Sequence, residues 1–250
     1  MMLLTFDYLT ESALEVKSKC HFNKNKEGDL MGDLMIEALL FDMDGLLLDT
    51  ERMQDKIWDK AKEHFHYDFN EAFKKEMRGI NIRASLKVYE KYFGKNFDYQ
   101  TVLKWRRAYF MEMAKDEGIP IKKGALDLLR YAREKKIHCA LATSTERDRF
   151  MQYIPYLEEN IFDYFEVIID GSMVKHSKPD PEIFLLAADK LGVAIEKCMV
   201  LEDSINGVKA GIASGAKTVM IPDLMQPTDE IKDQVYRILN DLSEVIKILK

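Results

Sequence analysis

The stretch IEALLFDMDGLLLDT, residues 36–50, decides the fold. It begins as an apolar run of the length of a buried strand and ends in two carboxylates, Asp42 and Asp44, before a glycine. Because alternate side chains of a strand point the same way, both carboxylates can face one pocket beyond the strand. Two carboxylates held together repel unless a cation or a proton lies between them. The stretch therefore predicts a chemical site at a strand end.

The rest of the chain repeats the pattern of strand and helix. Further strands are expected at Ile137–Thr143, Glu166–Asp170, Cys198–Glu202 and Lys217–Ile221. Helices are expected at Ala125–Lys135, Arg147–Glu158, Pro181–Leu191 and Ile205–Ser214. This alternation predicts an α/β fold with a doubly wound parallel sheet, in which ligands bind at the carboxyl ends of the strands. Asp42, Thr143 and Glu202 all fall at such ends.

One region interrupts the alternation. From about residue 51 to 118 the patterns are helical, at Gln54–Phe65, Glu71–Met77, Arg83–Phe93 and Tyr99–Ala114. Such an insertion is too long for a connection within a compact sheet. We therefore expect a helical cap domain at 51–118, its aromatic side chains forming its core, and an α/β core domain at 36–50 and 119–250. Residues 1–35 are expected to form a poorly ordered extension, and Leu239–Leu249 a closing helix.

Composition narrows the class of protein. The 250 residues carry a formal charge of −6, which argues against a dominant nucleic-acid surface. No apolar run approaches the ~18 residues that span a bilayer. Cys20, Cys139 and Cys198 are too scattered for a disulfide framework or a zinc site, and the last two fall in expected strands as buried thiols. We expect a cytoplasmic protein, a monomer, without nucleic-acid or membrane partners.

Three more groups are expected to converge on the first pair of carboxylates. They are the hydroxyls of Thr143, Ser144 and Thr145, the lysine Lys178 before a proline-initiated helix, and the acidic pair Glu202 and Asp203. Mg²⁺ takes oxygen ligands and leaves room for water and phosphate, which Asp42, Glu202 and Asp203 suit. A lysine and a hydroxyl beside such a metal would neutralise phosphate oxygens.

The four groups together resemble the haloacid dehalogenase superfamily. The likeness is closest to its β-phosphoglucomutases and small-molecule phosphatases, in which a helical cap follows the first motif. It covers about Ile36 to Ile221 and includes the strings DMDGLLLDTE, SKPDPEIF and VLEDSINGVKAGIASGA. The dehalogenase branch lacks the second aspartate, so Asp44 argues against dehalogenation.

The resemblance implies a role for each matching residue. Asp42 would be the nucleophile that forms an aspartyl-phosphate, and Asp44 the general acid and then base. Thr143 and Ser144 would bind the phosphoryl group, and Lys178 would pair with it and with Asp42. Mg²⁺ would be held by Asp42, the backbone carbonyl of Asp44, Glu202 and Asp203. Two non-catalytic interpretations are the nearest alternatives. Asp42 and Asp44 could mark a solvated strand end, and residues 202–204 could form a helix N-cap.

The cap is expected to select the substrate. Relatives carry a glycine-centred specificity loop where this chain has residues 77–83, so Arg78, Gly79 and Arg83 are candidates for substrate binding. Two solvated arginines flanking a helix are an equally good interpretation. Mutase members carry a histidine on the first cap helix where this chain has Gln54, and their loop arginine is unmatched at Ile82.

The resemblance thus predicts a Mg²⁺-dependent phosphatase. Its substrate would be a small phosphorylated metabolite, a sugar phosphate, hydrolysed through an aspartyl-phosphate. A β-phosphoglucomutase-type mutase is the alternative enzyme. A signalling receiver domain, which also clusters aspartates with a hydroxyl and a lysine, is the alternative without catalysis.

Overall fold

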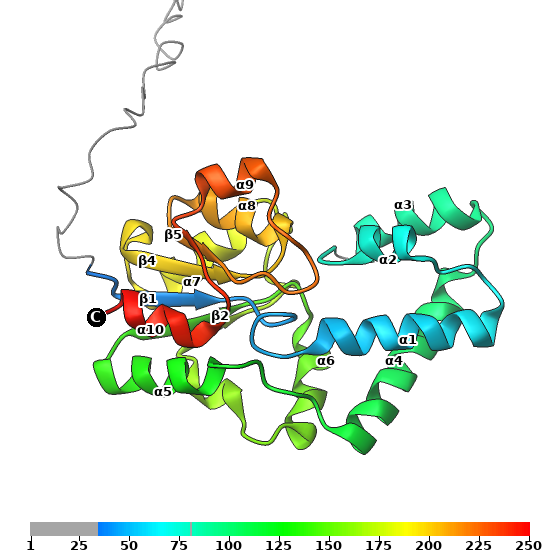
Figure 1. Ribbon diagram of the computed structural model, residues 1–250, viewed down its shortest axis with the longest axis horizontal. Helices are drawn as coiled ribbons and strands as arrows, with labels where there is room; N and C mark the ends of the chain where they lie inside the picture. The colour runs from blue at the N-terminus through cyan, green and yellow to red at the C-terminus, as the bar shows by residue number, and fades with distance from the viewer. Residues whose placement is uncertain (1–34, 81) are drawn as a thin grey trace, which may run out of the picture. The chain divides into compact units, whose positions relative to one another are not determined.

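In the computed structural model, which describes residues 35–80 and 82–250, six parallel strands form one sheet in the order β3-β2-β1-β4-β5-β6 (Figure 1). They are β1 Ala38–Phe41, β2 His138–Ala142, β3 Val167–Ile169, β4 Cys198–Glu202, β5 Lys217–Met220 and β6 Arg237–Ile238. The α/β parallel sheet predicted from the sequence is confirmed. The predicted extension lies, except for its last residue, outside the described residues.

The helices follow the predicted alternation. They are α1 Thr50–Phe65, α2 Glu71–Met77, α3 Ile82–Phe93, α4 Tyr99–Glu117, α5 Ala125–Lys135, α6 Arg147–Phe150, α7 Glu182–Leu191, α8 Ile205–Ser214, α9 Asp229–Gln234 and α10 Val245–Ile248. Short 3₁₀ turns occupy Met151–Tyr156, Ile161–Tyr164, Ile195–Lys197 and Leu242–Glu244. Within the described chain, no helix is both long and apolar enough to cross a membrane.

The two faces of the sheet are covered by different helices (Figure 1). On one face, buried strand residues such as Leu40 and Val200 pack with Phe184 of α7 and Ala210 of α8. The strand pleat turns alternate residues such as Phe41 to the other face, where α5 contacts β2 and α10 packs on α5. The central strands are therefore buried on both sides, as parallel strands require.

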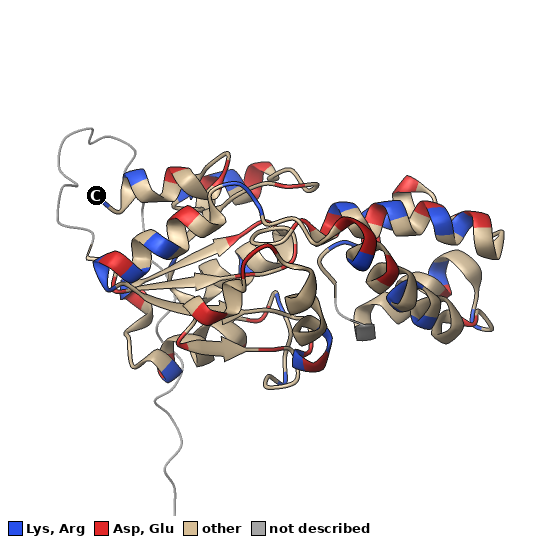
Figure 2. Cartoon of the chain, turned by 90° about the horizontal axis from the view of Figure 1, so that it is seen from below, with Lys and Arg blue, Asp and Glu red and all other residues tan. Residues whose placement is uncertain are grey.

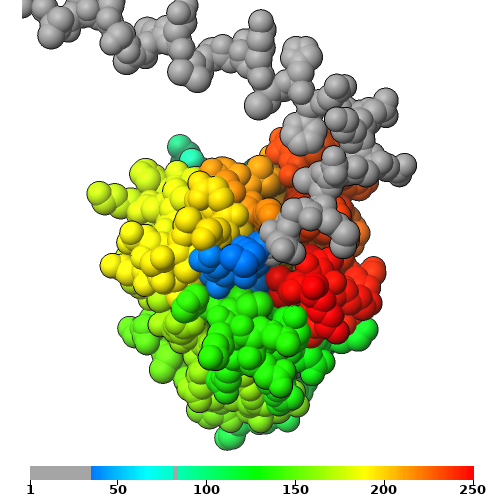
Figure 3. Space-filling model, turned by 90° about the vertical axis from the view of Figure 1, so that its left-hand side faces the viewer, coloured from blue at the N-terminus to red at the C-terminus, as the bar shows by residue number. Residues whose placement is uncertain are grey.

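The start of the described chain is fixed beside β4. In the space-filling view the blue segment that leads into β1 lies between the yellow segment before β4 and the red C-terminal segment (Figure 3). Glu37 donates its backbone N–H to the Lys197 carbonyl at 2.9 Å, and their side chains form an ion pair at 2.6 Å. This contact aligns β1 with β4.

Helices α1 to α4 pack around an aromatic cluster of their own. Its buried members include Trp58, Phe69, Phe73 and Tyr89, so the predicted aromatic interior of this region is present. Phe110 departs from that expectation, since it packs on Tyr153 outside the four helices, with ring centroids 5.1 Å apart. The boundary between cap and core at residues 51 and 118 stays a prediction.

Two helix predictions were wrong in extent. The helix expected at Arg147–Glu158 ends at Phe150 and continues as a 3₁₀ turn that contains Pro155. Proline lacks the N–H that a helix interior needs and restrains the residue before it, so the regular helix cannot continue. The closing helix expected at Leu239–Leu249 is reduced to Val245–Ile248 after a 3₁₀ turn.

Candidate active site

The ends of neighbouring strands place one lysine between two carboxylates. β1 pairs in register with β4, so Asp42 follows β1 at the level where Glu202 ends β4. Lys178, from the loop before α7, has its Nζ 2.5 Å from Asp42 Oδ1 and 2.7 Å from Glu202 Oε1. The same nitrogen donates to the Ala142 carbonyl at 2.9 Å. All three charged side chains are buried, so the ammonium is held in one position.

Burial and charge compete in this group. Burial and Glu202 raise the pKa of Asp42, while Lys178 lowers it, and the result is a pKa above the ordinary aspartate value. Burial disfavours the charged form of Lys178, but the two carboxylates outweigh it and raise its pKa. The lysine therefore remains an ammonium, and it can offer positive charge to an anion that reaches Asp42.

Both oxygens of Glu202 are occupied. Oε1 accepts from Lys178, and Oε2 accepts from the N–H groups of Asp203 and Ser204 and from the Ser204 hydroxyl, each at 3.0 Å. Gly207 of α8 leaves room for this carboxylate, because a Cβ there would lie 1.7 Å from Oε1. Glu202 therefore orients both Lys178 and the turn that carries Asp203.

Asp203 carries a buried Oδ1 that has no hydrogen-bond partner among the described residues. Burial, Glu202 and Asp42 raise the pKa of this carboxyl well above its usual range. Oxygens of the three carboxylates lie within 4.8 Å of one another, and only Lys178 pairs with them in the described chain. One ammonium leaves two negative charges uncompensated, which suits a divalent cation with oxygen ligands. The residues present therefore fit Mg²⁺.

Asp44 is oriented by two hydroxyl groups. The Thr50 hydroxyl donates to Oδ1 and the Thr145 hydroxyl to Oδ2, both at 2.7 Å. Thr50 begins α1, whereas Thr145 follows β2, so this carboxyl joins the first inserted helix to the sheet. Both hydroxyls donate to it in the resting arrangement, which leaves its remaining lone pairs for other donors.

The hydroxyl side chains after β2 lie beside this carboxyl. Thr143 is buried, and its Oγ1 accepts the N–H of Thr145 at 3.0 Å. Its own hydroxyl proton is thus available to an acceptor in the pocket. Ser144 is exposed and lines the same pocket.

These groups open into one pocket of about 180 Å³. From the sheet its lining includes Asp42, Asp44, Thr143, Ser144, Lys178 and Asp203, and from α1 to α4 it includes Gln54, Arg78, Gly79, Arg106 and Arg107. Figure 2 shows acidic residues, in red, where the strand arrows end. The sequence-predicted residues of both regions therefore line the same pocket, with two exceptions: Glu202, which is fully buried behind the lining and contacts Lys178, and one arginine whose side chain is not described.

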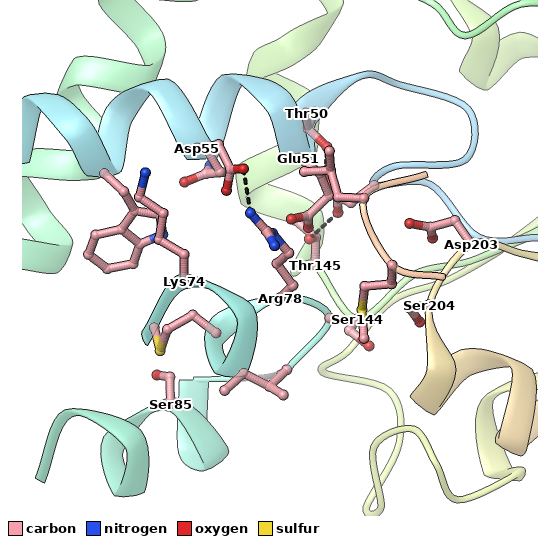
Figure 4. Close-up of a pocket in the computed structure, with 18 of the residues that line it drawn as sticks. Thr50, Glu51, Asp55, Lys74, Arg78, Ser85, Ser144, Thr145, Asp203 and Ser204 are labelled. Carbon is pink, nitrogen blue, oxygen red and sulfur yellow. Dashed lines mark hydrogen bonds and ion pairs between the residues drawn. The ribbon is translucent and has the colours of Figure 1, made fainter. Parts of the chain in front are cut away.

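That arginine is Arg83, whose side chain falls outside the described part of the chain. Its partner in the prediction, Arg78, points toward α1, where it donates to Asp55 Oδ2 at 2.5 Å (Figure 4). Gly79 has a φ of +66°, and a Cβ on it would lie 3.1 Å from Ser204 Cβ. The loop after α2 therefore approaches the turn after β4 by its backbone.

The lining residues that sequence reasoning did not propose include Glu51, Gln54 as a binding residue, Arg106, Arg107 and Arg149. Burial and the carboxylates of Asp44 and Asp55 raise the pKa of Glu51 to about 8. Glu51 follows the Asp-Thr of the first motif directly, which was the available signal. No local sequence pattern marks the three arginines as pocket residues, because only the tertiary fold brings α4 and α6 to the pocket.

Comparison with known proteins identifies the family of this chain. A model of the haloacid dehalogenase-like hydrolase family matches residues 36–215. A protein of Thermotoga maritima named phosphorylated carbohydrates phosphatase is 31% identical over 189 residues, which cover 74% of this chain and 84% of that protein. The chain belongs to the haloacid dehalogenase-like hydrolases. Within them it is an enzyme of the phosphatase kind, and the receiver-domain alternative does not hold.

Solved structures show the same fold. CbbY from Rhodobacter sphaeroides, crystallised with phosphate, is similar with a TM-score of 0.72 at 24% identity, over 84% of this chain and 96% of that one. A β-phosphoglucomutase from Clostridium difficile gives a TM-score of 0.68 at 23% identity, over 86% and 97%. The fold of this chain thus also occurs in a β-phosphoglucomutase, so the fold alone does not distinguish a phosphatase from a mutase.

Proposed function

We propose that this protein is a Mg²⁺-dependent phosphatase that hydrolyses a small phosphorylated carbohydrate through an aspartyl-phosphate on Asp42. The observation that carries the proposal is the buried contact of Lys178 with Asp42 and Glu202. This contact would hold a carboxylate nucleophile beside a fixed ammonium at the carboxyl ends of the strands. The carbohydrate part of the proposal is supported by the name of the Thermotoga maritima relative.

The cation would be held by Asp42 and Asp203, assisted by Glu202 and by the backbone carbonyl of Asp44. The unpartnered oxygen of Asp203 supports this assignment. When bound, Mg²⁺ would supply positive charge that offsets the repulsion between the carboxylates and the phosphate oxygens. Lys178 would supply the same from the other side.

The chemistry of the chain's own residues then divides into two transfers. In the first, a carboxylate oxygen of Asp42 forms a bond to phosphorus while the ester P–O bond breaks, and Asp44 gives a proton to the leaving oxygen. In the second, Asp44 takes a proton from water as that water attacks the phosphoaspartate. Phosphate leaves and both carboxylates return to their first states.

Thr143 and Ser144 would bind the transferring group. Because the Thr143 oxygen accepts the N–H of Thr145, its hydroxyl proton would be donated to an oxygen of the phosphoryl group. The inserted helices would cover the pocket and exclude water during the first transfer. Thr50, which begins α1 and donates to Asp44, would link that covering to the acid.

The side chain of Gln54 argues against the mutase alternative. Its Oε1 accepts a hydrogen bond from Arg106, and its amide cannot exchange protons with a sugar hydroxyl at neutral pH. The position that carries a histidine in mutases, by resemblance, is therefore neutral and engaged here. A cytoplasmic monomer without nucleic-acid or membrane partners remains our prediction for the protein as a whole.

The test is phosphate release from a panel of sugar phosphates, nucleotides and glycolate phosphate, with and without Mg²⁺. Glucose 6-phosphate formed from β-glucose 1-phosphate is followed in parallel. We expect metal-dependent phosphate release from carbohydrate phosphates. Glucose 6-phosphate that forms faster than phosphate would support the mutase instead.

A further inference from the structure

Three arginines line the pocket without an ion-pair partner. Arg106 and Arg107 are neighbours on α4, and Arg149 lies on α6. None of the three takes part in an ion pair within the described chain. Arg106 and Arg149 are partly buried, so their unpaired guanidinium groups lose part of their water and are costly in the free protein, whereas Arg107 is exposed at the edge of the pocket. A pocket wall of this kind therefore points to an anion that is bound there.

Arg106 is fixed in place. Its guanidinium carbon lies 3.3 Å from the centroid of the Trp58 ring, and it donates to Gln54 Oε1. Burial lowers the pKa of Arg106 to about 10, which still leaves it charged at neutral pH. Its Nε is buried without a partner in the described chain. A guanidinium stacked on an indole and held by an amide is a preorganised donor, and less entropy is lost when it binds.

The acidic side chains that share the pocket do not cancel this charge. Asp55 is already paired with Arg78 at 2.5 Å. The carboxyl of Asp44 receives two hydroxyl donors and lies at the sheet side. Glu51 acts electrostatically on Arg106 and Arg149, and Asp44 acts on Arg149, but two carboxyl groups do not balance three guanidinium groups. The wall formed by Arg106, Arg107 and Arg149 is thus positive.

We propose that the substrate carries a second anionic group, a phosphate or a carboxylate, which binds to Arg106, Arg107 and Arg149 while its reacting phosphate lies at Asp42. The proposal rests on the proposed function, since it extends that substrate away from the reacting end. It differs from the expectation that Arg78 binds the substrate, because Arg78 is already paired with Asp55.

Arginine suits this role for a geometric reason. Its planar fork donates two parallel hydrogen bonds to two oxygens of one phosphate or carboxylate, and such charge-assisted bonds are about twice as strong as neutral ones. A neutral sugar end leaves the three guanidinium groups unpaired and gains nothing from them. The wall would therefore select by the second charge of the substrate rather than by its hydroxyl pattern.

The test compares six-carbon phosphates that all carry a phosphate on carbon 6 and differ in the second charge. Fructose 6-phosphate, fructose 1,6-bisphosphate and 6-phosphogluconate are used with the wild type, Arg107→Gln, Arg149→Gln and the control Lys104→Gln. Lys104 lies on the same helix as Arg107 but is exposed and outside the pocket. Both kcat/KM with Mg²⁺ and the affinity of the metal-free proteins by calorimetry are measured.

We expect the wild type and Lys104→Gln to favour one of the doubly charged compounds by about tenfold or more, which is about 1.4 kcal/mol. Arg107→Gln and Arg149→Gln should lose most of that preference. The larger effect with fructose 1,6-bisphosphate would identify a phosphate as the second group, and with 6-phosphogluconate a carboxylate. Equal values for singly and doubly charged compounds, or a preference that both arginine variants retain, would overturn the proposal.

The two proposals fail in different ways. If no compound is hydrolysed but the metal-free protein binds a doubly charged compound more tightly through the arginines, the proposed function fails and this inference stands. If phosphate is released equally from all three compounds and their affinities are equal, the function stands and this inference fails.

Discussion

The Nζ of Lys178 lies 2.5 Å from Asp42 Oδ1 in a buried site at the end of the central strand. Since Glu202 shares the same ammonium, removal of Lys178 leaves two buried carboxylates without their cation. Breaking a buried pair from one side costs about 3–5 kcal/mol, because the remaining charge stays buried.

We therefore predict that Lys178→Met lowers the free energy of unfolding by about 3–5 kcal/mol in metal-free buffer and abolishes phosphate release. Urea unfolding measures the first effect. Lys197→Met is the matched control, because Lys197 forms an exposed ion pair with Glu37, for which about 0–1 kcal/mol is expected. Equal losses in the two variants would show that the Lys178 contact does not hold the site together.

A second prediction concerns the contact between Gly45 and Asp203. Gly45 has a φ of +87°, and a Cβ on it would lie 2.3 Å from Asp203 Oδ2. Gly192 has a similar φ of +71°, but a Cβ there meets nothing within 4 Å. Alanine at either site costs roughly 1–2 kcal/mol of backbone strain, whereas only Gly45→Ala should displace Asp203.

Gly45→Ala should therefore reduce phosphate release at least about tenfold and weaken the response to Mg²⁺, which corresponds to about 1.4 kcal/mol or more. Gly192→Ala should keep nearly full activity and lose only stability. The measurements are kcat/KM and the midpoint of thermal unfolding. An active Gly45→Ala variant would contradict the account of Asp203.

A third prediction concerns removal of the metal. Because the three carboxylates repel one another, Mg²⁺ should stabilise the folded protein, by about 2.7 kcal/mol at a hundredfold excess over its Kd. For a chain of this size that raises Tm by roughly 5–10 °C. The rise is measured by adding Mg²⁺ to protein treated with EDTA.

Asp203→Asn supplies the control for the metal. It removes the carboxylate with the unpartnered oxygen, so its Tm should respond to Mg²⁺ by less than half of the wild-type rise. If the Tm of Asp203→Asn rose with Mg²⁺ as much as that of the wild type, the cation would not bind at the proposed ligands.

A fourth prediction follows from the raised pKa of Glu51. Burial, Asp44 and Asp55 raise it to about 8, Asp223 adds to the rise, and Arg78 opposes it. A carboxyl whose folded pKa exceeds its unfolded value of 4.5 binds its proton more tightly when folded. The folded state therefore loses stability as the pH rises from about 4.5 to about 8, and loses no more above that.

Glu51→Gln removes this titration. Relative to the wild type in metal-free buffer, its free energy of unfolding should become larger from pH 5 to pH 8, which means that the variant gains stability, and the difference should then stay level. Glu63→Gln, at an exposed site on the same helix, is the control for the loss of a carboxylate from α1. A stability difference that does not vary with pH would contradict the raised pKa.

The strand ends could be predicted because their signals are local. Each of these strands is a short apolar run with a polar residue at its end or just after it, so Asp42, Thr143 and Glu202 could be placed at one edge of the sheet without coordinates. The register of β1 with β4 then explains why Asp42 and Glu202 share Lys178.

What failed depended on contacts that the sequence does not show. The arginine wall is formed by residues far apart along the chain, so no local pattern marks it. The short α6 is a failure of another kind, because Pro155, which prevents a regular helix beyond this point, is visible in the sequence and its effect was overlooked.

The most direct test of the central claim is acid quench of the enzyme during its first turnover, followed by mass spectrometry of the peptide that contains Asp42. A carbohydrate phosphate that the panel shows to be hydrolysed is the substrate, and Mg²⁺ is present. We predict that this peptide carries a phosphoryl group in the wild type and that Asp42→Asn neither forms it nor releases phosphate. Phosphate release by Asp42→Asn at the wild-type rate, with no phosphorylated peptide in either protein, would contradict the account.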